Sequence, residues 1–197
     1  SDSGRAEVLL KGSAVENLSL ILRNGDIIKE LRDEVDAYEY DLTIVGGSAK
    51  RNMSHDMIQY INSSLFVVNN FNKTINYKIL LAVDDSPSTK KAVKYGVRVA
   101  QAFGIKVKII TVNEDENFNE ANKRASESAS KMMRRCGVKA ETKLEIGKPA
   151  EKIIELAGED HIIIMGSSTQ SPIAKFFVGS KPLNVMQNSN CPILIVK

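Results

Sequence analysis

The chain has 197 residues, of which 43% are hydrophobic and 26% are charged, and its net charge is +3. This length can bury one large or two small cores, which excludes a miniprotein held together by disulfides. No apolar run approaches the roughly 18 residues that a membrane-spanning helix needs, and no signal peptide is visible at the start of the sequence. Neither Cys136 nor Cys191 belongs to a metal or redox motif. We therefore expect a cytoplasmic protein without membrane insertion.

Charge is distributed unevenly, because residues 1–76 are net negative and residues 77–197 are net positive. The basic residues of the second part are spread along predicted helices and are not gathered with aromatic residues. A solvated surface is the favoured interpretation of such a pattern. We therefore expect no nucleic-acid partner.

The first part of the chain predicts an incomplete α/β unit. A helix-like stretch at 5–11 precedes an apolar run at 18–22, a helix that opens at Gly25, and strand-like segments within 41–48 and 62–68. The run at 18–22 corresponds to the third strand of a doubly wound unit, so the first two strands are missing. Because the first strand of such a sheet is central, we expect that N-terminal sequence is absent, has been removed, or is supplied by another chain.

The second part predicts a complete α/β unit with a doubly wound, parallel, five-stranded sheet. Its strands are apolar along their length and alternate with helices, a pattern that indicates a parallel sheet covered on both faces. The predicted strands are 78–83, 106–112, 140–145, 161–165 and 193–196. The predicted helices are 89–102, 117–133, 150–156 and 182–187.

The two parts repeat one pattern at a distance of about 120 residues. Gly25 opens a helix that leads to a strand ending at Gly46, and Gly147 opens a helix that leads to a strand ending at Gly166. The repeat predicts three regions: an incomplete unit at 1–68, a polar linker at 69–76 and a complete unit at 77–197.

Ligands of open α/β sheets bind at the carboxyl ends of the strands, near the topological switch point. In the complete unit, residues 83–86 follow the first strand, Asn113 follows the second, and a long loop from Gly166 to Ser180 follows the fourth. Glycines in such a loop leave backbone N–H groups accessible to a phosphate, and an acidic residue after the first strand can hold a ribose hydroxyl or a base amine.

These segments resemble the universal stress protein family, in a tandem form whose first unit is incomplete and degenerate. The family's first strand ends in a Val-Asp-x-Ser segment, which residues 83–86 match. Its nucleotide-binding members carry Gly-x2-Gly-x9-Gly-Ser/Thr after the fourth strand, and this chain reads Gly166-x2-Thr169-x9-Gly179-Ser180. The terminal segment 191–196 also resembles the family. Thr169 stands where the family has its middle glycine, and Pro172 removes one N–H donor from the loop.

The resemblance implies a fold like that of the adenine nucleotide alpha hydrolases and a regulatory or stress-response module that binds ATP or AMP without strong catalysis. Mg²⁺ or Mn²⁺ is implied only with a triphosphate. By the family pattern, Asp84 meets the ribose or the adenine, Val112 lines the adenine pocket, and the segment 179–181 holds phosphates. The implied nucleotide-site residues are Val83, Asp84, Asp85, Val112, Met165, Gly166, Thr169, Gly179, Ser180 and Lys181.

The resemblance also implies a homodimer through the terminal strand, or a pseudo-dimer of the two units. The loop after Gly46 is shorter than the loop after Gly166 and lacks Gly-Ser, so we expect a structural or dimer-forming role for the first unit. An alternative interpretation of Asp84 and Asp85 is an acidic cap at a helix start.

Three functions remain open from the sequence. The first is the nucleotide-binding module, and the second is a ligand-free adaptor, for example the soluble part of a transporter. The third is a phospho-accepting receiver, suggested by Asp84 and Asp85, although the third predicted strand does not end in the aspartate that such a domain needs. No nucleophile, base and orienting group converge in the sequence, so we expect that the protein is not an enzyme.

Overall fold

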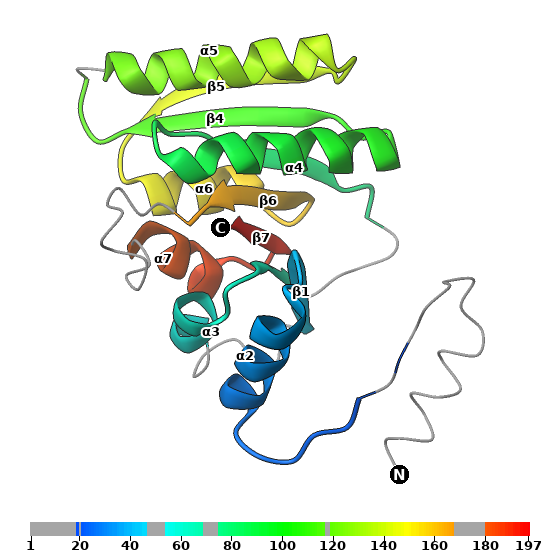
Figure 1. The fold of residues 1–197 in the computed structure, drawn as a ribbon. Helices are drawn as coiled ribbons and strands as arrows, with labels where there is room; N and C mark the ends of the chain where they lie inside the picture. Colours follow the sequence, from blue (N-terminus) through cyan, green and yellow to red (C-terminus); the bar gives the residue numbers. More distant parts are fainter. Residues whose placement is uncertain (1–18, 20, 47–53, 69–74, 117–118, 168–179) are drawn as a thin grey trace.

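The computed structural model describes residues 19, 21–46, 54–68, 75–116, 119–167 and 180–197. They form a seven-stranded sheet flanked by helices (Figure 1). The strands are β1 (Leu42–Gly46), β2 (Ser64–Val68), β3 (Lys78–Ala82), β4 (Val107–Asn113), β5 (Ala140–Ile146), β6 (His161–Gly166) and β7 (Ile193–Val196). The helices are α2 (Ile27–Tyr38), α3 (Ser54–Tyr60), α4 (Pro87–Phe103), α5 (Glu120–Arg135), α6 (Pro149–Ala157) and α7 (Ser180–Asn188).

The strand order is β1-β2-β7-β6-β3-β4-β5. Neighbouring strands are parallel except β2 and β7, which run antiparallel with Phe66 opposite Leu194. The predicted α/β class with a mainly parallel sheet is confirmed. All five strands predicted within 77–197 form, and β2 and β1 extend the same sheet to seven strands.

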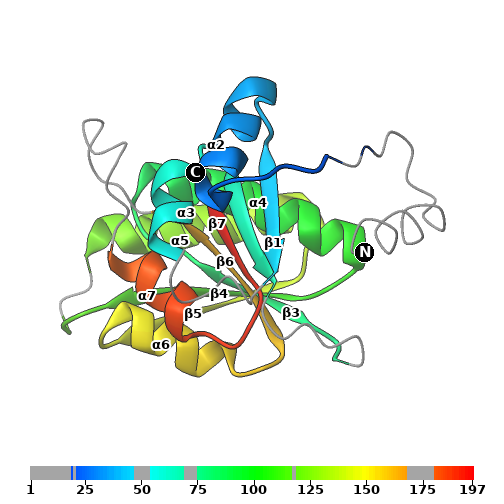
Figure 2. The ribbon, with the colours of Figure 1, turned by 90° about the horizontal axis from the view of Figure 1, so that it is seen from below.

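Helices cover both faces of the sheet because successive strand residues point to opposite sides. Leu81 packs with α4 and α5 on one face, whereas Leu80 points into the core on the other face, where α2, α3, α6 and α7 lie. On this second face α6 and α7 lie side by side (Figure 2). The buried residues that these four helices contribute include Val35, Ile58, Ile153 and Val185.

Helix α4 shows how the sequence sets the ends of an element. Pro87 occupies the first turn, where its missing N–H costs nothing. Gly104 follows the last turn with φ 63°, a left-handed conformation that glycine adopts without steric cost. The helix therefore extends slightly beyond the predicted 89–102 at both ends.

The prediction of a strand at 18–22 is wrong for the described residues of this run, since 19, 21 and 22 lie outside any strand. Strand β1 is the edge of the sheet instead, so no gap opens inside it. The outer edge of β1 could pair with a further strand, but residues 19, 21 and 22 do not pair with it. The helix-like stretch at 5–11 lies outside the described residues.

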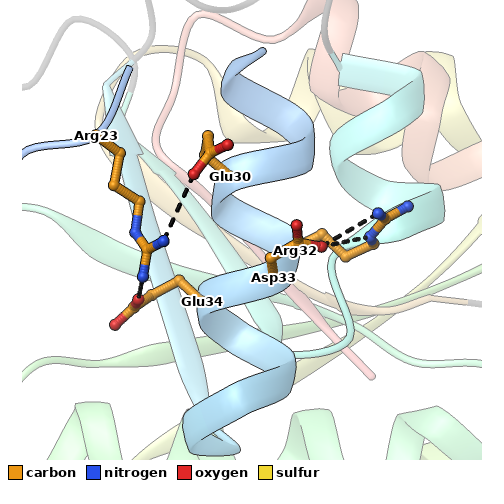
Figure 3. Close-up of polar contacts among 5 residues, drawn as sticks. All are labelled: Arg23, Glu30, Arg32, Asp33 and Glu34. Atoms are coloured by element: carbon orange, nitrogen blue, oxygen red, sulfur yellow. Dashed lines mark hydrogen bonds and ion pairs between the residues drawn. The ribbon is translucent and has the colours of Figure 1, made fainter. Parts of the chain in front are cut away.

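The segment before α2 is held against that helix by charge. The Arg23 guanidinium forms an ion pair with Glu30 at 3.5 Å and another with Glu34 (Figure 3). A second contact on α2 joins Arg32 to Asp33 at 3.1 Å. The ion pairs of Arg23 place this segment along α2.

The terminal strand β7 pairs on both sides, with β6 and with β2. Within the described residues β7 therefore has no free edge, and the homodimer or pseudo-dimer that the resemblance implies stays a prediction. The division at 1–68, 69–76 and 77–197 stays a prediction, and residues 69–74 lie outside the described ones. Within the part of the chain that the structure describes, no helix has the length and apolar character to cross a membrane.

Candidate functional site

The carboxyl ends of β3, β4 and β6 surround a small hollow, which we call the carboxyl-edge hollow. It lies at the switch point of the sheet, because β4 follows β3 on one side and β6 pairs with β3 on the other. Its volume is about 40 Å³. The residues that line it are Ala82, Val83, Asp84, Ile110, Val112, Pro149, Ile153, Met165, Gly166 and Lys181.

Asp84 is the acidic group of this hollow, and one of its two carboxylate oxygens is engaged. Oδ1 accepts hydrogen bonds from Ser86 N at 3.1 Å, Ser86 Oγ at 2.5 Å and Thr89 Oγ1 at 2.6 Å. These bonds hold the segment just before α4, but the N-cap residue is Ser86, and in the described part of the chain Asp84 accepts from no backbone N–H within the helix, so the capping of helix N–H groups by Asp84 is not seen. Among the described residues, Oδ2 accepts no hydrogen bond. Asp84 can therefore hold the loop and still offer one anionic acceptor to a ligand.

Gly166 ends β6 beside the first turn of α4. A Cβ added there would lie 2.3 Å from Ser88 Oγ and 2.9 Å from the Ser88 carbonyl carbon. No side chain fits this gap, so the close approach of helix and strand itself requires glycine. The glycine thus has a packing role that does not depend on a phosphate.

Apolar side chains from three elements form the wall of the hollow. Val83 and Met165 are buried at 3% and 5% exposure, and Val112 is partly buried. Ile153 contributes from α6, and Pro149 starts that helix. A flat, weakly polar ring matches such a wall, whereas the Lys181 ammonium suits an anion.

Asp85 differs from its neighbour because it is exposed and does not line the hollow. Its backbone N–H donates to Asn122 Oδ1 at 3.0 Å. The carbonyl of Val83, two residues earlier, accepts from Thr111 Oγ1 at 3.0 Å. The loop after β3 is therefore tied both to β4 and to α5.

The structure brings six of the ten sequence-predicted residues to the hollow. They are Val83, Asp84, Val112, Met165, Gly166 and Lys181. Thr169 and Gly179 lie outside the described residues, and Ser180 begins α7 without a described side chain.

Sequence reasoning missed four residues of the lining: Ala82, Ile110, Pro149 and Ile153. Ala82 and Ile110 each lie two residues before a predicted site residue, Asp84 and Val112. The other two belong to the helix after the third predicted strand, whose carboxyl end meets the same edge of the sheet. The signal for Pro149 was its place shortly after the third predicted strand, which ends at the same edge of the sheet as the first, second and fourth.

No histidine, cysteine or serine is among the described residues that line the hollow. Cys191 lies before β7, at the opposite edge of the sheet, and burial raises the pKa of its thiol. The described ranges also contain no group of three or more His, Cys, Asp or Glu side chains suited to a metal ion.

A larger apolar groove lies elsewhere, on the face of α4 and α5, beside β1 and β2. Its volume is about 760 Å³. It is away from the carboxyl ends of β3, β4 and β6, and hydrophobic side chains dominate its lining, so we do not take it as a nucleotide site. Its members include Leu42, Ile44, Phe66, Val99, Phe103 and Leu194.

Comparison with known proteins gives consistent matches. A family model described as "Universal stress protein family" matches residues 76–197. A universal stress protein of Thermus aquaticus is 34% identical over 133 residues, which cover 60% of this chain and 97% of that protein. The crystal structure of a universal stress protein from Archaeoglobus fulgidus matches 100% of this chain and 75% of its own, with a TM-score of 0.74 and 18% identity. A universal stress protein crystallised in complex with cAMP matches 62% of this chain and 98% of its own, with a TM-score of 0.52 and 26% identity.

Proposed function

The chain belongs to the universal stress protein family, and from that premise we propose that it is a regulatory module that binds an adenine nucleotide in the carboxyl-edge hollow. One observation carries the proposal: a free acidic oxygen of Asp84, an apolar wall and the side chain of Lys181 meet around one hollow at the switch point. A nucleoside phosphate needs an acceptor for its hydroxyl or amine groups, an apolar surface for its base and a cation for its phosphate.

Each group has a distinct task in this proposal. Asp84 Oδ2 accepts a hydrogen bond from a ribose hydroxyl or from the adenine amine, while Oδ1 stays bound to the start of α4. Val112 and Met165 contact the purine faces. Lys181 lies in the first turn of α7, where the helix dipole adds to the attraction of its ammonium for phosphate.

The ligand class is supported by the relative crystallised with cAMP, which is 26% identical to this chain. The match takes in 62% of this chain. We propose ATP or AMP as the ligand here. A divalent ion would arrive with a triphosphate.

Binding requires a change in the hollow, because about 40 Å³ is far below the roughly 300–1,000 Å³ of typical ligand sites. The Lys181 side chain is exposed and borders the hollow, so it can turn outward at little cost. We propose that the ligand enters as this side chain turns outward and its ammonium contacts the phosphate, and that no reaction follows, since the described lining offers no nucleophile with a base.

A ligand-free adaptor is the second candidate, and two observations favour it. The hollow is small, and the contact between Gly166 and Ser88 explains the glycine without any ligand. Under this candidate the Asp84 network serves only to start α4.

An isosteric pair of variants separates the two candidates. Asp84→Asn keeps an oxygen for the start of α4 and replaces the free acceptor by a donor, so we expect AMP affinity to fall about tenfold or more. Asp85→Asn removes the same charge one residue away and should leave affinity near wild type. Isothermal titration calorimetry with AMP and with ATP measures both. If wild type gives no binding heat with AMP and none with ATP, the result supports the adaptor and overturns the nucleotide proposal.

A further inference from the structure

The walls of the carboxyl-edge hollow lie partly beyond the end of the sheet. The last residue pair in register between β3 and β4 is Ala82 with Ile110, and Val83 N adds one bond of 2.8 Å to Ile110 O. Asp84 and Asp85 come after this ladder, so sheet hydrogen bonds do not set their position. The bonds of Asp84 and Thr111 anchor this loop to α4 and β4, and one further side-chain contact ties it to α5.

Asn122, on α5, makes that connection. Its Oδ1 accepts from Asp85 N at 3.0 Å, and its Nδ2 donates to Asn113 Oδ1 at 3.3 Å. Because a backbone N–H is always a donor, the contact with Asp85 fixes which end of the amide carries the oxygen. The amide therefore accepts from one loop and donates to the other.

Asn113 extends the connection to a third loop. It ends β4, is buried at 8% exposure, and its backbone oxygen accepts from Gly147 N at 2.8 Å. Gly147 lies just before Pro149, which lines the hollow. The segments after β3, β4 and β5 are thus joined in one line through Asn122 and Asn113.

We propose that Asn122 is a positioning residue that sets the place of the Asp84 loop relative to the Val112 and Pro149 walls. Its effect on ligand affinity rests on the proposed nucleotide function, whereas its hold on the loop does not. The amide both accepts and donates at this site, whereas the isosteric carboxylate accepts but cannot donate, and an aliphatic side chain does neither.

The role can be separated from general stability. Helix α5 is anchored in the core by Ala129 and Met133, which are 2% and 0% exposed. Asn122 lies nearer the start of the helix and is only partly buried. Its replacement should therefore loosen the loop without unfolding the helix.

The test combines two variants with a site-specific readout in the full chain. In Asn122→Ala, hydrogen exchange at the Asp85 amide, followed by NMR, should speed up about tenfold as its acceptor is lost. The Gly147 amide donates to a backbone oxygen, so its exchange should not change and serves as an internal reference. Asn122→Asp keeps the acceptor and loses the donor, so it should retain protection at Asp85. Asn190→Asp, at an exposed site away from the hollow, controls for the added charge.

Calorimetry with AMP supplies the second readout. We expect Asn122→Ala to weaken AMP binding about fivefold or more while the melting temperature stays close to that of wild type. Unchanged exchange at Asp85 overturns the inference, as does faster exchange with unchanged AMP affinity. If wild type gives no heat with AMP or ATP, the nucleotide proposal fails. The Asp85 exchange then decides by itself whether Asn122 holds the loop.

Discussion

Gly46 and Gly166 occupy equivalent places in the predicted repeat, each at the end of a parallel strand, yet their surroundings differ. A Cβ on Gly166 would collide with Ser88, whereas a Cβ on Gly46 would meet no atom within 4 Å. The same sequence signal therefore marks a required glycine in one part of the chain and a tolerant position in the other. Packing of the helix that follows β3 makes the difference.

The difference predicts unequal costs of the same substitution. Gly166→Ala should lower the free energy of unfolding by about 1–3 kcal/mol, because the added methyl group overpacks the contact with α4. Gly46→Ala should cost much less. Urea denaturation of both variants measures the costs, and Ser88→Gly in the Gly166→Ala background should recover part of the loss. Equal costs at the two glycines would contradict this account of Gly166.

Motif spacing predicted which residues meet at the hollow, since the carboxyl ends of parallel strands share one edge of a sheet. Strand-end spacing pointed to Asp84 and Val112, and the family resemblance pointed to Lys181; all three line the hollow, and their contact with a nucleotide stays a prediction. The spacing did not predict Ser88 against Gly166 or Asn122 against the Asp85 loop. Those contacts depend on how a helix packs over a strand end, and the alternation of apolar residues does not encode that distance.

At the scale of elements, the end of α3 is joined to the end of β7 by one side chain. The Lys197 ammonium donates to the backbone oxygens of Ile58 and Ile61, at the carboxyl end of α3. Burial lowers the pKa of Lys197 from 10.5 to about 8. The contact gives these two elements a link whose strength depends on pH.

The lowered pKa of Lys197 fixes the sign of this dependence. Between pH 8 and 10.5 the unfolded chain holds the Lys197 proton more tightly than the folded chain does, so folding becomes more favourable as pH rises through this window. The free energy of unfolding of wild type should rise there by roughly 1–3 kcal/mol relative to Lys197→Met. Urea denaturation at several pH values measures the difference. A difference that stays constant from pH 8 to 10.5 would contradict the lowered pKa.

The positions of strands along the sequence were easier to predict than the strands with which they pair. The terminal strand was predicted at 193–196, where β7 lies, because a run of four apolar residues after Cys-Pro is a strong local signal. The run at 18–22 has a similar local pattern but forms no strand in its described residues. A strand needs a neighbour, and local sequence does not reveal whether one is present.

At the scale of the whole molecule, two parts of the chain share one sheet and one core. The core on the face of α6 and α7 includes Leu65 from the first part and Ile195 from the second, which lie opposite each other across the antiparallel pair β2 and β7. The repeat in the sequence predicted two similar parts. It could not predict their union, because pairing across 69–76 is a long-range contact that composition does not specify.

Two of the pockets in the described part of the chain differ strongly in character, and their locations allow a direct test. The carboxyl-edge hollow carries Val112 and Ile153, and the apolar groove carries Ile44 and Leu194. Titration of the methyl-labelled protein with AMP, followed by NMR, reports on all four side chains at once. We predict shifts at Val112 and Ile153 with Ile44 and Leu194 unchanged. Shifts confined to Ile44 and Leu194, or none at saturating AMP, would contradict binding in the carboxyl-edge hollow.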